Sequence, residues 1–395
     1  MEPAGRILFC ATVARHLERF HQPVMRWFKS RGWEVHAAAS GDLEIPWADR
    51  QFDVPFSRSP AKLSNIRAYR EIRRIIDEGG YRLIHCHTPT AGALTRLAAR
   101  AARRGGARVL YTAHGFHFQA GGPKLNWVLF YPLERQLARL TDCLITINEE
   151  DYRLAADRRF PAGRIVRVHG VGVDPERFRP ADAETRRGMR AKLGYGMDDQ
   201  LLFYAAEFNK NKNQRMLIET LALLKDKFPR ARLLLAGDGP QRPDCEALAD
   251  RLGVRDRVSF LGYRPDIADW LPALDIAVAS SFREGLPVNV LEAMACGLPV
   301  VATSNRGHRE LVSEGKSGWL VPPGDSARMA ERVGRLLASP RERASFGAAG
   351  RTIASSAYGL DAVMAEMRAI YASILGEMEI LQWERKSGFF TPSST

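Results

Sequence analysis

The chain has 395 residues, of which 45% are hydrophobic and 26% are charged, and its formal net charge is +13. This composition is typical of a folded protein, and the length exceeds what one hydrophobic core usually organises, so we expect two domains. No apolar run approaches the length that spans a bilayer, and the first residues lack a basic segment followed by a long apolar core. We therefore expect neither a transmembrane helix nor a signal peptide, and a cytoplasmic location.

The positive charge is concentrated in the first part of the chain. Residues 1–180 hold 29 Lys and Arg against 18 Asp and Glu, a net charge of +11, whereas the remaining residues hold 29 against 27, a net charge of +2. Such a field attracts anions, which include nucleic acid, anionic lipid headgroups and lipid-linked diphosphates.

The cysteines are scattered and form no C-x-x-C pair. Several of them stand in apolar, strand-like runs, so we expect small buried hydrophobic residues in a reducing compartment. The five positions are Cys10, Cys86, Cys143, Cys245 and Cys296.

Apolar, β-rich runs alternate with helical patterns along the whole chain. In the first half the runs are 7–13, 35–39, 83–87, 109–113, 143–147 and 165–168; in the second half they are 201–206, 232–236, 258–261, 276–280, 300–303 and 319–321. Strand–helix alternation of this kind predicts parallel sheets covered on both faces, so the fold class is α/β with two doubly wound domains.

Turn residues and charge mark a linker after residues 169–175, and we place the domain boundary near residue 179. The predicted domains are residues 1–178 and 179–359. A last amphipathic helix is predicted within 360–378, with one apolar stripe. Residues 379–395 have no helical or strand periodicity and are predicted to form a mobile tail.

Two glutamates stand eight residues apart around a predicted helix start. Glu284 precedes the turn formed by Gly285, Leu286 and Pro287, and Glu292 lies inside the helix that this turn opens. A helix N-terminus attracts a diphosphate because its unpaired amides and its dipole both favour an anion. Carboxylates accept hydrogen bonds from hydroxyl groups, so the pair suits the sugar and ribose of a sugar nucleotide.

This Glu-x7-Glu element, with the following AMACGLPVVA at 293–302, resembles the donor-site signature of the family-4 retaining glycosyltransferases. The resemblance covers roughly residues 5 to 378 and is strongest to members that build bacterial exopolysaccharide or capsule repeat units. Further matching stretches, in the same order as in the family, are YTAHGFH at 111–117, NKNKN at 209–213, GDGP at 237–240, FLGYR at 260–264 and GWLV at 318–321.

The resemblance implies the GT-B architecture, in which two Rossmann-like domains face each other across a cleft. It implies retaining transfer of a sugar from a nucleoside diphosphate, with a UDP-hexose or UDP-N-acetylhexosamine as the expected donor. The expected acceptor is a polyprenyl-diphosphate-linked saccharide bound by the first domain, at the inner face of the plasma membrane. The second domain is then the nucleotide-sugar-binding domain, and the terminal helix crosses back to the first.

By the same resemblance, the catalytic candidates are His114, Glu284 and Lys212. The family has an Arg at the position of Glu207 and a Lys at that of Lys212, so one of two expected cations is missing. Either Lys210 replaces the missing charge, or Glu207 faces Lys210 or Lys212 and orients it. The structural alternative is that residues 209–213 form a solvated turn.

The remaining nucleotide-sugar contacts implied by the resemblance come from three stretches of the second domain. They are Glu207, Lys210 and Lys212; Gly262, Tyr263 and Arg264; and Ser281, Glu284, Gly285, Leu286, Pro287, Val288, Asn289 and Glu292.

No metal or other cofactor is expected. The chain contains no Asp-x-Asp triplet, so Lys212 and helix N-termini are expected to supply the positive charge at the diphosphate. His85, Cys86 and His87 do not form a metal site by this reasoning, because alternation along a strand places Cys86 on the opposite face from the two histidines.

Two helical stretches of the first domain carry rows of arginines. They are Arg67, Arg70 and Arg74 in the first stretch, and Arg96, Arg100, Arg103 and Arg104 in the second. We hypothesise that one of these faces meets an anionic membrane surface, against the alternative of an ordinary solvated helix face.

Three other functions remain open from the residues. A sugar-nucleotide epimerase of the same architecture would need no acceptor groove, which leaves the basic first domain unexplained. A nucleic-acid binder would explain the charge, but no helix-turn-helix, zinc-finger or aromatic stacking motif accompanies it. A two-domain binding protein for small ligands would normally be exported.

Overall fold

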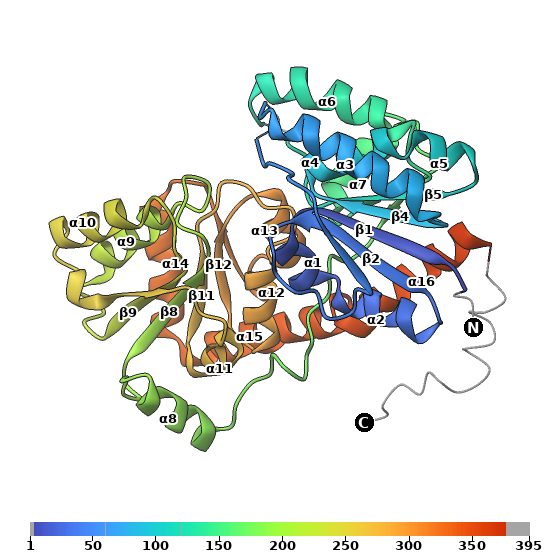
Figure 1. The fold of residues 1–395 in the computed structure, drawn as a ribbon. Helices are drawn as coiled ribbons and strands as arrows, with labels where there is room; N and C mark the ends of the chain where they lie inside the picture. Colours follow the sequence, from blue (N-terminus) through green and yellow to red (C-terminus); the bar gives the residue numbers. More distant parts are fainter. Residues whose placement is uncertain (1–3, 60, 120, 377–395) are drawn as a thin grey trace. The chain divides into compact units, whose positions relative to one another are not determined.

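The computed structural model describes residues 4–59, 61–119 and 121–376 (Figure 1). The chain forms two compact units. Unit 1 consists of Met1–Val171 and the chain from Val363 onward, and unit 2 consists of Gly172–Ala362. The predicted tail, residues 379–395, lies outside the described residues.

Unit 1 is built on a seven-stranded parallel sheet with the order β3-β2-β1-β4-β5-β6-β7. Its strands are β1 (Arg6–Val13), β2 (Glu34–Ser40), β3 (Arg50–Asp53), β4 (Leu83–His87), β5 (Arg108–Ala113), β6 (Cys143–Thr146) and β7 (Arg164–Arg167). Its helices are α1 (Ala14–Phe20), α2 (Gln22–Ser30), α3 (Ser64–Gly79), α4 (Pro89–Ala98), α5 (Arg100–Arg104), α6 (Lys124–Ala138), α7 (Glu149–Asp157) and most of α16 (Leu360–Leu375).

Unit 2 has a six-stranded parallel sheet with the order β10-β9-β8-β11-β12-β13. Its strands are β8 (Gln200–Ala205), β9 (Ala231–Ala236), β10 (Val258–Gly262), β11 (Ile276–Ala279), β12 (Val300–Thr303) and β13 (Gly318–Val321). Its helices are α8 (Ala183–Lys192), α9 (Gln214–Leu224), α10 (Arg242–Arg251), α11 (Ile267–Trp270), α12 (Val288–Ala295), α13 (Arg306–Leu311), α14 (Ser326–Ala338) and α15 (Pro340–Ser356), with short 3₁₀ turns at Arg255–Arg257 and Leu271–Ala273.

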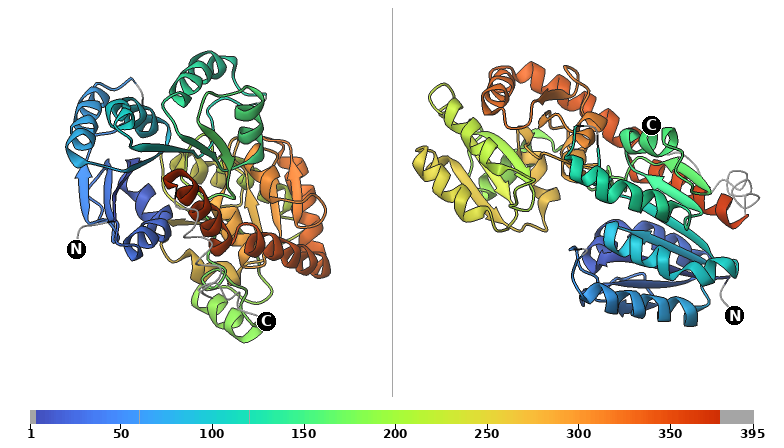
Figure 2. Two further views of the ribbon diagram at one scale, coloured as in Figure 1. Left: turned by 90° about the vertical axis from the view of Figure 1, so that its right-hand side faces the viewer. Right: turned by 90° about the horizontal axis from the view of Figure 1, so that it is seen from above.

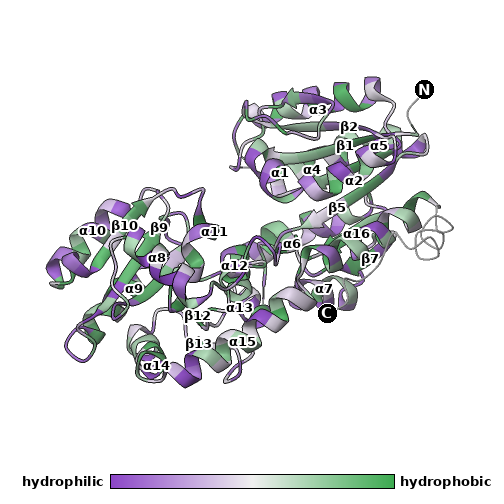
Figure 3. Ribbon diagram, turned by 90° about the horizontal axis from the view of Figure 1, so that it is seen from below, coloured by the Kyte–Doolittle hydropathy of each residue, from purple (hydrophilic) through white to green (hydrophobic). Residues whose placement is uncertain are grey.

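Each sheet is covered by helices on both faces (Figure 2). The central strands are buried along their whole length, as in β4 and β11, where every residue is inaccessible to solvent. Figure 3 shows this as hydrophobic colouring of strands such as β5. Apolar residues on both sides of a strand require a cover on both sides, which explains why these runs form parallel rather than half-exposed sheets. The two predicted doubly wound domains are confirmed.

All five cysteines are buried and unpaired, as predicted. Strand β3 was not predicted, because its sequence RQFD is polar and it is an exposed edge strand. Among the described residues, no helix combines the length and the apolar character needed to cross a membrane.

The unit boundary lies between Val171 and Gly172, seven residues before the predicted one at 178/179. The predicted last helix is α16, and its residues from Val363 belong to unit 1. There the hydroxyl of Tyr371 lies 2.7 Å from Nδ1 of the buried His85, and the Tyr371 ring packs against Phe28. The end of the helix is therefore part of the core of unit 1.

The second arginine row does not form one exposed face. Arg96 is 1% exposed, donates to Glu134 at 2.9 Å and lies over the ring of Tyr111 at 3.8 Å. Burying an unpaired guanidinium would be costly, so this ion pair explains the arginine as a core residue. Arg103 makes two hydrogen bonds of 3.0 Å to Asp142. The assignment of Arg96 to a membrane-facing surface is wrong.

The first row is exposed but partly neutralised. Arg74 lies 2.6 Å from Glu71 and 2.9 Å from Glu78, so its charge is balanced on its own helix, α3. Four of the proposed arginines are exposed: Arg67, Arg70, Arg100 and Arg104. An ordinary solvated face accounts for α3.

We expect Gly347→Ala in α15 to destabilise unit 2. An ideal Cβ at this position would stand 2.0 Å from the carbonyl oxygen of Gly297, so α15 would have to move away from the turn between α12 and β12. Such overpacking costs about 1–3 kcal/mol, which should lower the melting temperature measured by calorimetry by several degrees.

The matched control is Gly188→Ala in α8, where nothing lies within 4 Å of the added atom. Alanine is favoured over glycine in a helix by about 1 kcal/mol, so this variant should melt at the same or a higher temperature. Equal melting temperatures for the two variants would contradict the packing that we describe.

Candidate functional site

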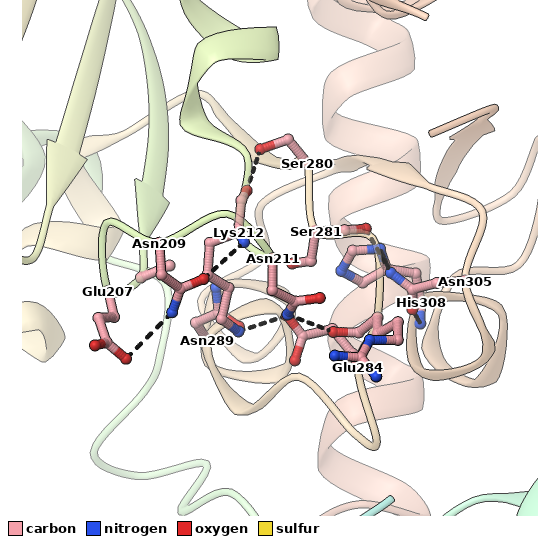
Figure 4. A network of polar contacts seen from close by, with 12 residues as sticks. Glu207, Asn209, Asn211, Lys212, Ser280, Ser281, Glu284, Asn289, Asn305 and His308 are labelled. Atoms are coloured by element: carbon pink, nitrogen blue, oxygen red, sulfur yellow. Dashed lines mark hydrogen bonds and ion pairs between the residues drawn. The ribbon is translucent and has the colours of Figure 1, made fainter. Parts of the chain in front are cut away.

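Several predicted donor residues lie close together at one edge of the sheet of unit 2, among them Glu207, Lys212 and Glu284 (Figure 4). Strands β8, β11 and β12 are neighbours in this sheet, and their carboxyl ends lead into residues 206–213, 280–287 and 304–305. Parallel strands end at the same edge, which brings loops from distant parts of the sequence together.

An ion pair joins two of the three catalytic candidates. Nζ of Lys212 lies 2.5 Å from Oε1 of Glu284, and the side chains are 22% and 12% exposed. The backbone of Lys212 is held as well, because its amide donates to Oδ1 of Asn209 at 3.0 Å. The structure therefore places a partly buried cation directly beside the carboxylate that precedes the Gly-Leu-Pro turn.

Glu207 does not orient Lys212, so that part of the sequence hypothesis is wrong. Its exposed carboxylate accepts a hydrogen bond from Nδ2 of Asn209 at 3.2 Å, while Lys212 pairs with Glu284. Lys210 is exposed at the same loop. The position of Lys210 therefore agrees with the hypothesis that it replaces the arginine that the family has at the position of Glu207.

Residues 209–213 are tied to the neighbouring loop rather than freely solvated. Nδ2 of Asn211 donates to the carbonyl of Arg283 at 3.0 Å, and the amide of Phe282 donates to the carbonyl of Asn211 at 2.8 Å. Ser280 also donates to the carbonyl of Lys212 at 2.8 Å. These bonds fix the position of Lys212 relative to the turn at Glu284.

Ser281, predicted as a donor contact, is buried in this structure, and its side chain supports the turn from inside. The residue is 0% exposed, and its hydroxyl lies 2.7 Å from the hydroxyl of Tyr204. Its carbonyl accepts from Thr303 Oγ1 at 2.6 Å and from Asn305 Nδ2 at 2.9 Å. Burial, and next the charge of Glu284, raise the pKa of Tyr204 well above 10, so its hydroxyl stays protonated.

Helix α13 packs directly on the Glu284 turn, which the sequence did not reveal. Nε of Arg306 donates to the carbonyl of Glu284 at 3.1 Å. A Cβ at Gly307 would stand 2.8 Å from Cβ of Glu284 and 3.0 Å from the carbonyl oxygen of Gly285. The sequence signal that could have revealed α13 is the polar run SNRGH at residues 304–308. This run directly follows β12, just as the other loops of this edge directly follow their strands.

Helix α12 is fastened to β8 through its first turn. Nδ2 of Asn289 donates to the carbonyl of Ala205 at 2.9 Å, so this amide group serves the scaffold. Pro287 is the residue before the helix, and Leu286 is buried. Glu292 is 7% exposed within the helix. The predicted helix start after the Gly-Leu-Pro turn is confirmed.

The segment at 262–264 forms a turn at the end of β10. Gly262 has a φ of 66°, which favours glycine, and the amide of Tyr263 donates to Oδ2 of Asp238 at 2.9 Å. The Tyr263 side chain is 54% exposed. Arg264 lies over the ring of Trp270 at 4.7 Å and pairs with Asp266, so its guanidinium is held within this turn.

In unit 1, His114 lies directly after β5 and belongs to a cluster of imidazoles. Its Nε2 lies 3.2 Å from Nε2 of His16 and 3.3 Å from Nδ1 of His87. Nε2 of His21 lies 3.3 Å from that of His16. Burial lowers the pKa of His114 well below 6.5, with a smaller contribution from His16, so the ring is neutral.

Sequence reasoning missed His16 and His21 because their proximity to His114 depends on sheet order. Strand β1 passes directly into α1 and places His16 at the carboxyl edge, where β4 and β5 also end. His85 lies outside the cluster: its ring nitrogens face Tyr371 at 2.7 Å and Thr112 at 2.8 Å. Cys86 lies near the carbonyls of Gly92 and Leu110, apart from both histidines, and His85 and His87 differ in their hydrogen-bond partners.

Two family models match the chain. "Glycosyl transferase 4-like domain" matches residues 17–170, and "Glycosyl transferases group 1" matches residues 185–353.

Among curated proteins, the putative glycosyltransferase EpsD of Bacillus subtilis is 47% identical, over 94% of this chain and 97% of its own length. Alpha-D-kanosaminyltransferase of Streptomyces kanamyceticus is 27% identical, over 86% and 89%. Among solved structures, Anabaena HepE in complex with UDP and glucose superimposes with a TM-score of 0.79 at 20% identity, over 93% of this chain and 100% of that one.

We expect acid to destabilise unit 2 through His308, which is fully buried at the donor loops. Its Nδ1 lies 2.7 Å from the carbonyl oxygen of Thr303, and burial, with a smaller effect of Lys212, lowers its pKa to about 4. The unfolded chain binds a proton near pH 6.5, so stability is complete above that pH and falls between pH 6.5 and 4. The loss from this residue amounts to roughly 3 kcal/mol.

The measurement is the melting temperature of the wild type and of His308→Gln from pH 7.5 to 4. The wild type should lose more stability over this range than the variant, since the variant has no imidazole to protonate. Parallel curves would show that His308 is not buried as described.

Proposed function

This chain belongs to the family-4 glycosyltransferases of the GT-B fold, and from that membership we propose that it transfers a sugar, with retention, from a UDP-sugar to a lipid-linked saccharide. The observation that carries the proposal is the Lys212–Glu284 pair beside the N-terminal turn of α12. The EpsD relative supports exopolysaccharide synthesis as the process, and the UDP and glucose bound by HepE support the donor class. A sugar-nucleotide epimerase is not favoured, because the relatives are glycosyltransferases.

The donor diphosphate binds to Lys212 and to the amide groups that open α12. A diphosphate is a stronger partner for the ammonium than a single carboxylate, so its arrival exchanges one ion pair for another. Glu284 is then released within the site, where its oxygens accept hydrogen bonds from hydroxyls of the transferred sugar. No metal is required at the diphosphate in this arrangement, since the cation and the helix end supply the charge.

The nucleoside is held by helix α12 and by the turn at the end of β10. Glu292, in the second turn of α12, accepts hydrogen bonds from the ribose hydroxyls. The base lies against the turn of Gly262 and Tyr263, where backbone groups provide the contacts because Arg264 is engaged by Asp266 and Trp270. Lys210 supplies the second positive charge in place of the family arginine.

In the transfer itself the bond between the anomeric carbon and the phosphate oxygen breaks, and the acceptor oxygen bonds to the same face of that carbon. The acceptor proton passes to the departing phosphate, so no protein nucleophile is needed. Lys212 stabilises the negative charge that develops on the phosphate. In unit 1, His114 contacts the sugar at the carboxyl end of β5.

Lys212→Met should weaken UDP binding about tenfold to hundredfold, because it removes the cation from the diphosphate. Glu292→Gln should also weaken UDP binding. Glu284→Gln should leave UDP affinity unchanged or higher, since Lys212 no longer pairs with a carboxylate, and should lower turnover of the UDP-sugar. Isothermal titration with UDP and product analysis by mass spectrometry check these three results.

Lys316→Met is the matched control, because Lys316 is an exposed lysine of unit 2 outside this edge. It should bind UDP as the wild type does. If Lys212→Met also binds UDP normally, the diphosphate does not bind at this pair. If no donor in a screen of sugar nucleotides is hydrolysed or transferred, the proposed reaction is wrong.

For the membrane surface we propose α6 in place of the arginine rows. This helix exposes an apolar stripe at helical spacing, formed by Leu125, Val128, Leu129 and Leu133, which are 46–68% exposed. Lys124 and Arg139 are exposed at its two ends. A helix with one apolar face and flanking basic residues suits the boundary of an anionic bilayer, where a lipid-linked acceptor is found.

Flotation with liposomes checks this surface. The wild type should float with anionic vesicles and much less with zwitterionic ones, and the double variant Val128→Glu, Leu129→Glu should lose most of the recovery. Leu223→Glu is the control, since Leu223 is 60% exposed on α9 of unit 2. Equal flotation of the double variant and the wild type would exclude α6 as the membrane contact.

A further inference from the structure

Four histidines of unit 1 bring ring nitrogens to one point. His16 lies in α1, His21 lies between α1 and α2, His87 is the last residue of β4, and His114 follows β5. One nitrogen from each ring lies within 4.8 Å of all the others. The four residues are separated by up to 98 positions in the sequence, so the carboxyl edge of the sheet assembles the cluster.

Three of the six nitrogen–nitrogen distances match those of a tetrahedral ion. The three contacts in the cluster measure 3.2, 3.3 and 3.3 Å. Zinc binds histidine nitrogen at 2.0–2.1 Å, and four such ligands in a tetrahedron stand about 3.3 Å apart. The remaining nitrogen pairs lie within 4.8 Å, so ion binding would require these rings to reorient toward one centre.

Hydrogen bonds between the neutral rings cannot account for all three nitrogen–nitrogen contacts. Each nitrogen of a neutral imidazole carries either one hydrogen or one lone pair, so it makes one linear hydrogen bond. Nε2 of His16 and Nε2 of His114 each face two other ring nitrogens. At most two of the three contacts are therefore hydrogen bonds, whereas an ion at the centre accepts all four lone pairs.

The surroundings favour neutral rings, and a small cavity adjoins three of the four histidines. His21 and His87 are buried, and Nε2 of His87 has no hydrogen-bond partner within the part of the chain that the structure describes. A cavity of about 30 Å³ adjoins His21, His87 and His114. Its other walls are mainly apolar and include Phe20, Val24, Val168, Val363 and Met367. His16 and His114 are partly exposed, which provides a path from solvent.

We propose that His16, His21, His87 and His114 bind one divalent transition-metal ion, with zinc as the preferred ion. Four imidazoles suit zinc and its neighbours, whereas magnesium and calcium prefer oxygen ligands. The ion would fasten α1 and the start of α2 to the ends of β4 and β5, and so would fix the position of His114. Ligation through Nε2 leaves Nδ1 of His114 for a hydrogen bond to substrate.

This site is separate from the donor site of unit 2, and its test is a measurement of metal rather than of activity. The full chain is prepared without an affinity tag or chelator, and its metal content is measured by mass spectrometry. We expect about one zinc per chain. After removal of the ion, titration with Co²⁺ should give the intense visible bands of a tetrahedral complex, with an end point of one equivalent.

His16→Asn and His114→Asn change partly exposed positions, so they preserve the fold better than changes at the buried rings. Each should weaken Co²⁺ binding at least about a hundredfold. His117→Asn is the control, because His117 lies three residues after His114 but packs against the ring of Phe130 at 4.9 Å. It should bind Co²⁺ as the wild type does.

The proposal is overturned if the metal-free wild type gives no tetrahedral Co²⁺ spectrum, or if His16→Asn and His114→Asn bind Co²⁺ as tightly as His117→Asn. Circular dichroism identifies a variant that fails to fold. UDP titration of the same metal-free protein separates this question from the proposed function. Normal UDP binding with no metal binding rejects the metal site alone, and the reverse result rejects the donor site alone.

Discussion

The structure depends on one constraint, which is that strands buried on both faces can expose polar groups to solvent only where they end. In β4 and β11 every residue is buried, so an exposed functional side chain has no place along their length. Because all pairs of strands in both sheets are parallel, the carboxyl ends collect at one edge of each sheet. The donor loops of unit 2 and the histidines of unit 1 both follow from this arrangement.

The Lys212–Glu284 pair shows how a charged site remains stable without its ligand. A lone ammonium in a partly buried position would be costly, and the carboxylate removes this cost while both groups stay within reach of solvent. The same pair is poised for exchange, because a ligand with more negative charge competes for the cation. The buried hydroxyls of Ser281 and Thr303 form hydrogen bonds beneath the turn at Glu284 and help to fix its position.

Much of the fold was predictable from sequence because apolar runs report burial directly. The sheets, the helix after the Gly-Leu-Pro turn and the position of residues 206–213 and 280–287 at the carboxyl ends of strands follow from local pattern. The edge strand β3 was missed because it is polar, and Arg96 was misassigned because helical periodicity does not reveal a buried partner such as Glu134. The approach of His16 to His114 requires the strand order, which no local pattern contains.

The direct passage of β1 into α1, from Val13 to Ala14, leaves no loop at the first crossover of unit 1. Backbone amides in a glycine loop grip any phosphate alike, whatever the surrounding residues. Here the polar groups at this end of β1 come from side chains instead, such as the imidazole of His16, whose Nε2 lies 3.2 Å from that of His114. Because no loop separates the strand from the helix, His16 stands three residues beyond the end of β1, and its imidazole is held by the position of that strand in the sheet.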